Sequence, residues 1–198
     1  MFLKLTVRIL GVASSMRNGS YSTLALKNAL EYAKKNGIET RLLDLKETRL
    51  PMFYSEDDDT PEIKQVTEDV KWADAFILAT PDYHGSMSGN MKNFLDYFWS
   101  DFAGKLFGYI CASHEKGLTA MEQMRTAVRQ CYGWSMPYGV SIHGEEDFEN
   151  EEIKNHKLKS RLLMLSRDLS VYGEILRNQF LIDIENSIQE TFANRYKK

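Results

Sequence analysis

Two short polar segments carry residues that could bind a charged molecule with a flat ring. The first, SSMRNGSYST at residues 14–23, combines five serine and threonine hydroxyls with the guanidinium of Arg17. Hydroxyls, a planar cation and the free amides of a helix N-terminus are the groups that hold phosphate in proteins. Capping of a helix by Ser20 or Ser22 explains part of the same pattern without a ligand. The segment therefore predicts either a phosphate site or an ordinary capped helix.

The second segment, PDYHGS at residues 81–86, follows an apolar stretch and precedes a helical pattern. Pro81 fixes the exit of the chain, the ring of Tyr83 can lie flat against a planar ligand, and Gly85 lets the backbone approach closely. The alternative is a plain connection in which Ser88 caps the next helix and Tyr83 covers the core. Taken with the first segment, the turn indicates a ligand that has both a phosphate and a ring.

Several other kinds of site are disfavoured by missing patterns. The chain contains neither GxGxxG nor GxxxxGK[ST], which argues against a dinucleotide fold and a nucleoside-triphosphate loop, and leaves a mononucleotide. The sequence GSMSG has Met87 where a serine hydrolase needs its nucleophile. A single histidine in a turn, such as His84, is more often structural than catalytic, and no histidine has a metal-ligand pattern around it.

The elements that must position these segments follow an alternating order. Short apolar runs alternate with helical periodicity, which predicts an α/β fold in which helices cover both faces of a parallel sheet. We expect strands at about 7–13, 39–45, 74–79, 106–112 and 136–142. We expect helices at about 20–36, 89–102, 118–131 and 151–172. A further helix should begin at Pro61, after an N-cap at Thr60. The capping-box spacing of Ser187 and Glu190 predicts a short terminal helix.

In an open sheet of strand order 2-1-3-4-5, ligands bind at the carboxyl edge where the strand order reverses. Both polar segments fall there, after the first and third strands, and together they suggest FMN. The length of 198 residues fits a single domain, residues 1–198, with a C-terminal extension at about 173–198.

Composition limits the choice of partners. A net charge of -3 without a basic stripe argues against nucleic acid as a partner. The two cysteines, Cys111 and Cys131, suit a reducing cytoplasmic setting, and no apolar run approaches the roughly 18 residues of a membrane span. Lys4 and Arg8 interrupt the apolar opening, so we expect no signal peptide.

Three stretches resemble a known family. ILGVASSMRNGSYSTLAL, LPMFYSEDD and ADAFILATPDYHGSMSGNMKNFLDYF look like the NAD(P)H-dependent FMN reductases, flavodoxin-like proteins that include quinone, azo-dye and chromate reductases. The resemblance spans about residues 7–142 and implies a three-layer flavodoxin-like sandwich that binds FMN, with NADPH or NADH as co-substrate.

The resemblance also implies roles for individual residues. In the phosphate loop it assigns phosphate binding to Ser15, Arg17, Ser22 and Thr23. In the flavin turn it assigns the ring to Pro81, Asp82, Tyr83, His84, Gly85 and Ser86. The loop after the fourth strand would supply Ser113 and Gly117. This chain departs from the family pattern in having Ser14 for glycine and Asp82 for glutamate, and in keeping only Gly117 beside His114 and Glu115 in that last loop.

The expected reaction leaves the difficult chemistry to the flavin. A hydride passes from NAD(P)H to FMN, and the electrons then go to a small acceptor such as free flavin, a quinone, an azo compound or a metal oxyanion. One alternative is a flavodoxin-type electron carrier, against which Arg17 and the modest net charge count. Another is a flavodoxin-like shell that has lost its cofactor.

The segment 89–102 is more apolar than one face of a surface helix requires. Its aromatic residues are Phe94, Tyr97, Phe98, Trp99 and Phe102. We expect this helix to form a homodimer or a dimer of dimers, as the resemblance favours. The alternative is that the helix is buried between the sheet and the C-terminal segment.

Overall fold

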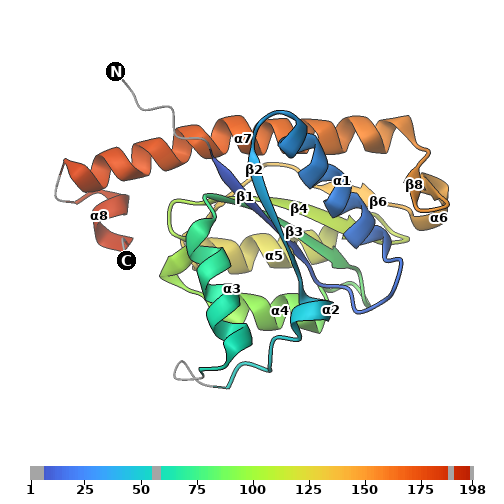
Figure 1. Ribbon diagram of the computed structural model, residues 1–198, viewed down its shortest axis with the longest axis horizontal. Coiled ribbons are helices and arrows are strands. Elements are labelled where there is room, and N and C mark those ends of the chain that lie inside the picture. Colours follow the sequence, from blue (N-terminus) through green and yellow to red (C-terminus); the bar gives the residue numbers. More distant parts are fainter. Residues whose placement is uncertain (1–6, 55–58, 187–189, 197–198) are drawn as a thin grey trace.

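The computed structural model describes residues 7–54, 59–186 and 190–196, and its centre is a parallel sheet. The strands are β1 (Arg8–Ala13), β2 (Glu39–Asp44), β3 (Ala75–Pro81), β4 (Leu106–Ala112), β5 (Trp134–Ser135) and β6 (Val140–Ile142). They lie in the order β2-β1-β3-β4-β5, with β6 also paired to β4. This confirms the predicted flavodoxin-like order. All of these strands except β5 are labelled in Figure 1. The predicted fifth strand at 136–142 is wrong in extent, because the strand is split around Pro137, which has no backbone N–H to donate.

Helices cover both faces of the sheet and make the fold three-layered. One face packs against α1 (Tyr21–Lys35) and α7 (His156–Glu185), and the other against α3 (Pro61–Trp72), α4 (Gly89–Asp96) and α5 (Leu118–Gln130) (Figure 1). Neighbouring residues of β1 serve opposite layers: Ile9 packs in the first cluster and Leu10 in the second. Burial on both faces explains why the strands are apolar without alternation.

The helix starts follow local chemistry. Thr60 accepts a hydrogen bond from the amide of Ile63 at 3.3 Å, and Pro61 takes the first position of α3, as predicted. Ser88 caps α4 by accepting from the amide of Met91 at 3.2 Å. A one-turn helix, α2 (Leu45–Thr48), follows β2.

The segment 89–102 is mostly internal and only partly helical, which corrects the helix predicted over its full length. The helix ends at Asp96, and a short 3-10 helix, Ser100–Phe102, follows. Phe94, Phe98 and Phe102 are buried beside the stacked rings of Phe76 and Phe107, whose centroids lie 4.5 Å apart. Most of the apolar surplus is therefore core, and Trp99, at 62% exposure, is the exception.

The chain beyond β6 also differs from the sequence prediction. The short helix α6 (Gly144–Asp147) leads into a hairpin of β7 (Phe148–Glu149) and β8 (Glu152–Ile153). The long helix therefore starts at His156 rather than near residue 151, capped by Asn155, which accepts from the amide of Lys157 at 2.9 Å.

Helix α7 continues through the first half of the predicted extension at 173–198, and α8 (Phe192–Tyr196) follows it. Phe180 of α7 packs against Ala103 and Ala193 in a small third core. Two parts of the sequence predictions lie outside the described residues. They are Ser187 of the predicted capping box and residues 55–58 of the stretch LPMFYSEDD. None of the helices in the described ranges is long and apolar enough to cross a bilayer.

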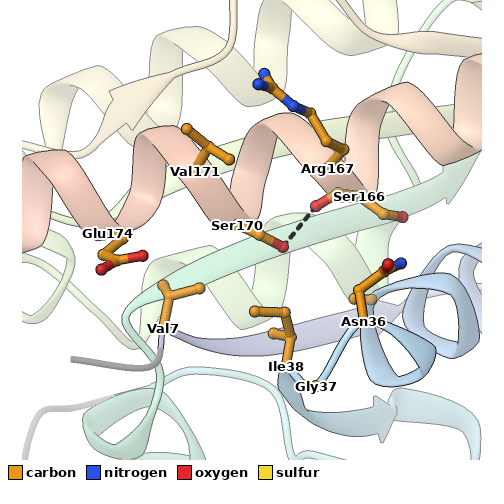
Figure 2. Close-up of a pocket in the computed structure, with 10 residues that line it drawn as sticks. Val7, Asn36, Gly37, Ile38, Ser166, Arg167, Ser170, Val171 and Glu174 are labelled. Carbon is orange, nitrogen blue, oxygen red and sulfur yellow. Dashed lines mark hydrogen bonds between the residues drawn. The ribbon is translucent and has the colours of Figure 1, made fainter. Parts of the chain in front are cut away.

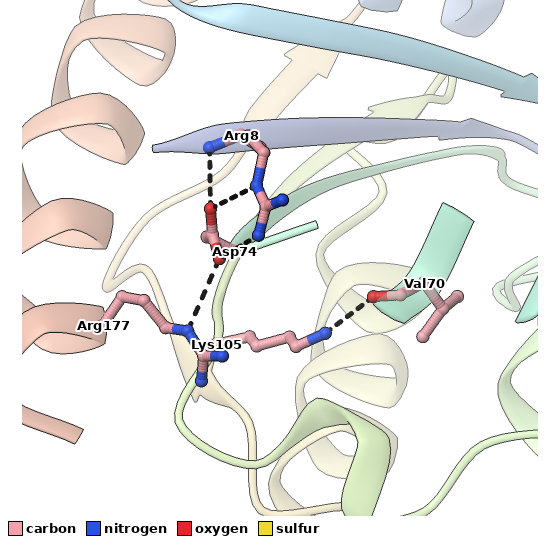
Figure 3. Close-up of polar contacts among 5 residues, drawn as sticks. All are labelled: Arg8, Val70, Asp74, Lys105 and Arg177. Carbon is pink, nitrogen blue, oxygen red and sulfur yellow. Dashed lines mark hydrogen bonds and ion pairs between the residues drawn. The ribbon is translucent and has the colours of Figure 1, made fainter. Parts of the chain in front are cut away.

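Charged side chains gather at the amino edge of the sheet, away from the loops that were predicted to bind a ligand. Asp74 accepts from the Nε atom of Arg8 at 3.0 Å and lies 3.4 Å from Nε of Arg177, while Lys105 donates to the carbonyl of Val70 at 2.6 Å (Figure 3). A cavity of about 430 Å³ lies nearby, between α7 and the turn after α1 (Figure 2). The loops that were predicted to bind FMN lie at the opposite, carboxyl edge.

Candidate functional site

The loops after β1 and β3 are tied together at the carboxyl edge. The amide and the hydroxyl of Ser14 both donate to the carbonyl of Ala79, each at 3.1 Å. The hydroxyl of Ser88 lies 2.8 Å from that of Ser14. Ser14, which stands where the family pattern has glycine, is fully buried and has no left-handed φ. Its side chain therefore holds the two predicted ligand loops side by side.

The turn after β3 is a tight reversal. Tyr83 and Ser86 exchange backbone hydrogen bonds of 2.9 and 3.2 Å. Between them His84 and Gly85 have φ of 57° and 75°, the left-handed values of a type I′ turn. Glycine adopts this conformation at little cost, and histidine is enriched there among other residues. The turn presents Tyr83, a residue that is 41% exposed.

Asp82 fixes this turn to the loop after β4. Its Oδ1 atom accepts from the amide of Gly85 at 2.8 Å, and its Oδ2 atom accepts from the hydroxyl of Ser113 at 2.7 Å. Ser113 in turn accepts from the amide of Glu115 at 3.0 Å. The shorter aspartate, in place of the family's glutamate, therefore has a complete set of local partners.

Gln123 of α5 holds the same turn from its other side, a contact that the sequence did not predict. Its Oε1 atom accepts from the hydroxyl of Ser86 at 2.8 Å and from the amide of Met87 at 3.3 Å. A polar residue at a partly buried position of α5 was the available signal, but helical periodicity does not say which loop such a residue meets.

A cavity of about 620 Å³ opens between these loops. Of the predicted site residues, those that line it are Ser15, Arg17, Pro81, Asp82, Tyr83 and Ser113. The predicted residues that do not line it are Ser22, Thr23, His84, Gly85, Ser86 and Gly117. Ser86 instead lines a neighbouring cavity of about 680 Å³ between the turn, α4 and α5.

The structure explains why two of the predicted residues, Ser22 and Gly117, do not line the cavity. Ser22 is fully buried in the first turn of α1, with its hydroxyl 3.0 Å from that of Ser20. Gly117 has φ of 61°, and a Cβ there would lie 2.4 Å from the sulfur of Cys111. Gly117 therefore lets α5 start close against β4. Burial also raises the pKa of the Cys111 thiol to about 12, so that sulfur stays protonated.

The part of the cavity beside the first turn of α1 has the groups that bind a phosphate. Ser20 is the N-cap residue of α1 but makes no side-chain capping bond, which leaves the first-turn amides uncapped by it. Arg17 lines the cavity, and within the described part of the chain its guanidinium forms no hydrogen bond or ion pair. Gly19, with φ of 62°, keeps the loop free of a side chain beside this cation. These donors fit the phosphate of FMN.

The fourth side of the cavity comes from the segment after β6, which the sequence analysis missed. Its lining residues are His143, Gly144, Glu145 and Glu146. The sequence feature that could have identified them is their position directly after the last strand, since the carboxyl ends of parallel strands share one edge. The other lining residues are Asn18, Gly19, Ser20 and Tyr21, which lie within the predicted phosphate segment but were given no individual role as ligands, and Ala112 and His114.

Comparison with known proteins shows which family the chain belongs to. Residues 7–147 match the family model described as NADPH-dependent FMN reductase. The FMN-dependent NADPH-azoreductase of Staphylococcus aureus (strain USA300) is 34% identical over 151 residues, which cover 71% of this chain and 79% of that protein.

Solved structures resemble the fold at low sequence identity. A flavoenzyme NAD(P)H:(acceptor) oxidoreductase from Paracoccus denitrificans has a TM-score of 0.73 and 16% identity, covering 85% of this chain and 98% of its own. An NADH:FMN oxidoreductase in its apo form has a TM-score of 0.68 and 18% identity, covering 84% of this chain and 90% of its own. At such identity these two structures support the flavodoxin-like fold alone. The match over residues 7–147 and the azoreductase relative go further: the chain belongs to the NADPH-dependent FMN reductase family and is an oxidoreductase that uses FMN and NAD(P)H.

Proposed function

We propose that FMN binds in the 620 Å³ cavity, with its phosphate at the start of α1 and its ring against the turn at Tyr83. The observation that carries this proposal is the guanidinium of Arg17, which lines the cavity without a partner in the described part of the chain. In this arrangement Arg17 and the hydroxyl of Ser15 bind phosphate oxygens. Ser22, whose buried hydroxyl meets that of Ser20, supports the loop, and Thr23 does not line the cavity.

The turn residues orient the ring. Asp82 and Gln123 hold the turn from two sides, so ligand binding should require little reorganisation of the backbone around Tyr83. When bound, FMN supplies the redox chemistry by taking a hydride from NAD(P)H and passing electrons to an acceptor.

Backbone amides of the loop after β4 are candidates to face the pyrimidine edge of the ring. The amide of Ser113 donates to the carbonyl of Ile142 at 3.0 Å, and that of Glu115 donates to Ser113. In the described part of the chain the amide of His114 has no such partner. We therefore assign this role to His114, whose backbone can donate to an oxygen that gains negative charge.

For the acceptor we propose a small aromatic molecule of the azo or quinone type, as the name of the azoreductase relative suggests. Such an acceptor would take its electrons from the bound flavin. A flavodoxin-type carrier is disfavoured by the family match. The two cysteines are free thiols, and a cytoplasmic location agrees with them.

We also propose a homodimer that uses the region around α4. Trp99 is 62% exposed, and Met52, at 77%, lies on a segment that packs against α4, where the rings of Phe53 and Tyr97 meet with centroids 5.1 Å apart. Light scattering of the protein with and without Trp99→Glu tests this, and an unchanged mass in the two samples would exclude Trp99 from the interface.

Arg17 provides the direct test of FMN binding. We expect Arg17→Ala to weaken FMN binding about ten- to hundredfold, the range of a lost charge-assisted pair, and to leave the binding of riboflavin, which has no phosphate, unchanged. Arg129→Ala, an exposed arginine on α5, is the matched control. Quenching of flavin fluorescence measures both constants. Equal losses for FMN and riboflavin would place Arg17 outside the phosphate site.

A further inference from the structure

A lysine from the loop after β2 is bound to a residue that lines the cavity. Lys46 of α2 donates from Nζ to the Oδ1 atom of Asn18 at 2.6 Å, and Asn18 lines the cavity together with Arg17. The sequence analysis gave neither Lys46 nor Asn18 a role, because no local pattern joins two residues that lie 28 positions apart. The contact ties the loop after β2 to the loop after β1.

The register of the sheet explains how these two residues meet. β1 and β2 are parallel neighbours, and Ala13, the last residue of β1, is aligned with Asp44, the last residue of β2. The loops that follow the two strands therefore leave the same edge side by side. Asp44 also caps α2 by accepting from the amide of Lys46 at 3.1 Å, which fixes the backbone that carries the lysine.

The contact decides which end of the Asn18 amide is left for a ligand. An ammonium group donates hydrogen bonds and accepts none, so it must face the oxygen of the amide and not the nitrogen. Among the residues that the structure describes, none bonds the Nδ2 atom of Asn18. Asn18 therefore brings two unused N–H donors to the wall of the cavity, next in sequence to Arg17. A phosphate dianion only accepts hydrogen bonds, and N–H donors are the groups that bind it.

We propose that Asn18 donates a hydrogen bond from Nδ2 to the phosphate of FMN, and that Lys46 is the positioning residue that sets the orientation of the amide. The inference rests on the proposed FMN site and adds these two residues to it. Without Lys46 the amide can rotate by half a turn, which brings its oxygen toward the phosphate oxygens and repels them. The charge of Lys46 is largely balanced by Glu47, whose carboxylate lies 3.2 Å from Nζ, so Lys46 acts mainly through the amide.

FMN and riboflavin differ only in the phosphate, so the ratio of their dissociation constants isolates contacts to that group. Asn18→Ala should weaken FMN binding about tenfold, as expected for a lost hydrogen bond to a charged group, and leave riboflavin binding unchanged. Asn18→Asp keeps an acceptor for Lys46 but replaces both N–H donors with a negative charge, so its loss should be larger. Quenching of flavin fluorescence measures both constants for each variant.

Lys46→Met should weaken FMN binding about three- to fivefold, because the amide oxygen would then face the phosphate part of the time. Lys46→Arg also supplies donors and no acceptor, so it should restore FMN binding to within about twofold of wild type. Lys35→Met is the matched control, because Lys35 lies at the far end of α1, pairs with Glu31 at 4.0 Å and does not line the cavity. It should change neither constant.

The double variant separates positioning from a direct effect of charge. If Lys46 acts through the amide, Lys46→Met should add no further loss of FMN binding in an Asn18→Ala background. A further loss of similar size there overturns the role of Lys46. Wild-type ratios of the two constants in the Asn18 and Lys46 variants overturn the whole inference.

Arg17→Ala keeps the test of the proposed function separate. A selective loss of FMN binding in that variant, with none in the Asn18 and Lys46 variants, overturns this inference and leaves the proposed function standing. No selective loss in any of the three overturns both.

Discussion

The hydroxyl of Ser14, after β1, lies 2.8 Å from the hydroxyl of Ser88, which caps α4. Both residues are buried, and Ser14 also donates to the carbonyl of Ala79. The bond therefore joins the loop after β1, the end of β3 and the start of α4 at a single point. A glycine at position 14, the residue of the family pattern, would make none of these side-chain contacts.

Ser14→Ala should lower the free energy of unfolding by about 1–2 kcal/mol, because a buried hydroxyl pair is lost and Ser88 keeps a reduced set of partners. Ser88→Ala should cost more, since it also removes the cap that the amide of Met91 uses. Urea denaturation of the two single variants and the double variant measures the coupling. Strictly additive losses would show that the 2.8 Å contact contributes nothing of its own.

Asp82→Ala should loosen the turn and weaken FMN binding about tenfold, because the amide of Gly85 and the hydroxyl of Ser113 both lose their acceptor. Asp82→Asn keeps an acceptor for Gly85 and an amide that can donate to Ser113, so its loss should be several times smaller. Fluorescence titration with FMN compares the two. If both variants bind FMN as wild type does, the turn does not depend on this carboxylate.

Gly104→Ala should destabilise the packing of the C-terminal extension. Gly104 has φ of 73°, and a Cβ there would lie 2.4 Å from the ring of Phe180. Gly37, with φ of 80° and nothing within 4 Å, offers a matched control in which only the backbone conformation is penalised. We expect about 1–2 kcal/mol for Gly37→Ala and about 1–3 kcal/mol more for Gly104→Ala.

The excess cost of Gly104→Ala should disappear in a Phe180→Ala background, where the clash is gone. Urea denaturation gives the four free energies, and limited proteolysis reports whether the segment after residue 173 detaches first. An excess that persists without the Phe180 ring would mean that the steric explanation is wrong.

The sequence predicted an element correctly where the interactions that form it involve neighbouring residues. The run at 106–112 is apolar because both faces of β4 are covered, and its predicted bounds are those observed. Thr60 and Pro61 identify the start of α3 because capping involves neighbouring residues. Helix ends that depend on distant contacts were missed, as at Asp96, where the following aromatic residues turn into the core beside Phe76.

The site was predictable to the same extent. Pro81 ends a buried strand and Asp82 and Tyr83 follow it, and all three line the cavity at the carboxyl edge, where the sequence predicted them. Which hydroxyl of the first loop faces a ligand depends on where the turn of α1 begins, and Ser22 points inward because α1 starts at Tyr21. The contact of Gln123 with the turn joins residues far apart in the chain, and no local pattern reveals it.

Lys105 gives a prediction for the amino edge of the sheet. It is buried, and burial first, then the nearby Arg177, lowers the pKa of its ammonium group to about 8 (Figure 3). Below pH 8 the lysine is charged in the folded and unfolded states alike, and the cost of burying that charge is constant. Between pH 8 and its ordinary pKa of 10.5, the unfolded chain holds a proton that the folded chain has released. Folding stability therefore rises with pH across this window, by about 3 kcal/mol from this group.

Lys105→Met should remove that rise, because methionine does not titrate and fills a similar volume beside Phe76. At pH 7 the variant should be as stable as wild type or more stable, since a buried charge with one uncharged acceptor, the carbonyl of Val70, is replaced by an apolar chain. Urea denaturation at intervals from pH 7 to 10.5 measures the difference between the two proteins, in which the titration of all other groups cancels. If the stability of the two proteins changed with pH in parallel, Lys105 would keep its proton throughout the window. Its ammonium group would then be stabilised by more than the contacts described here.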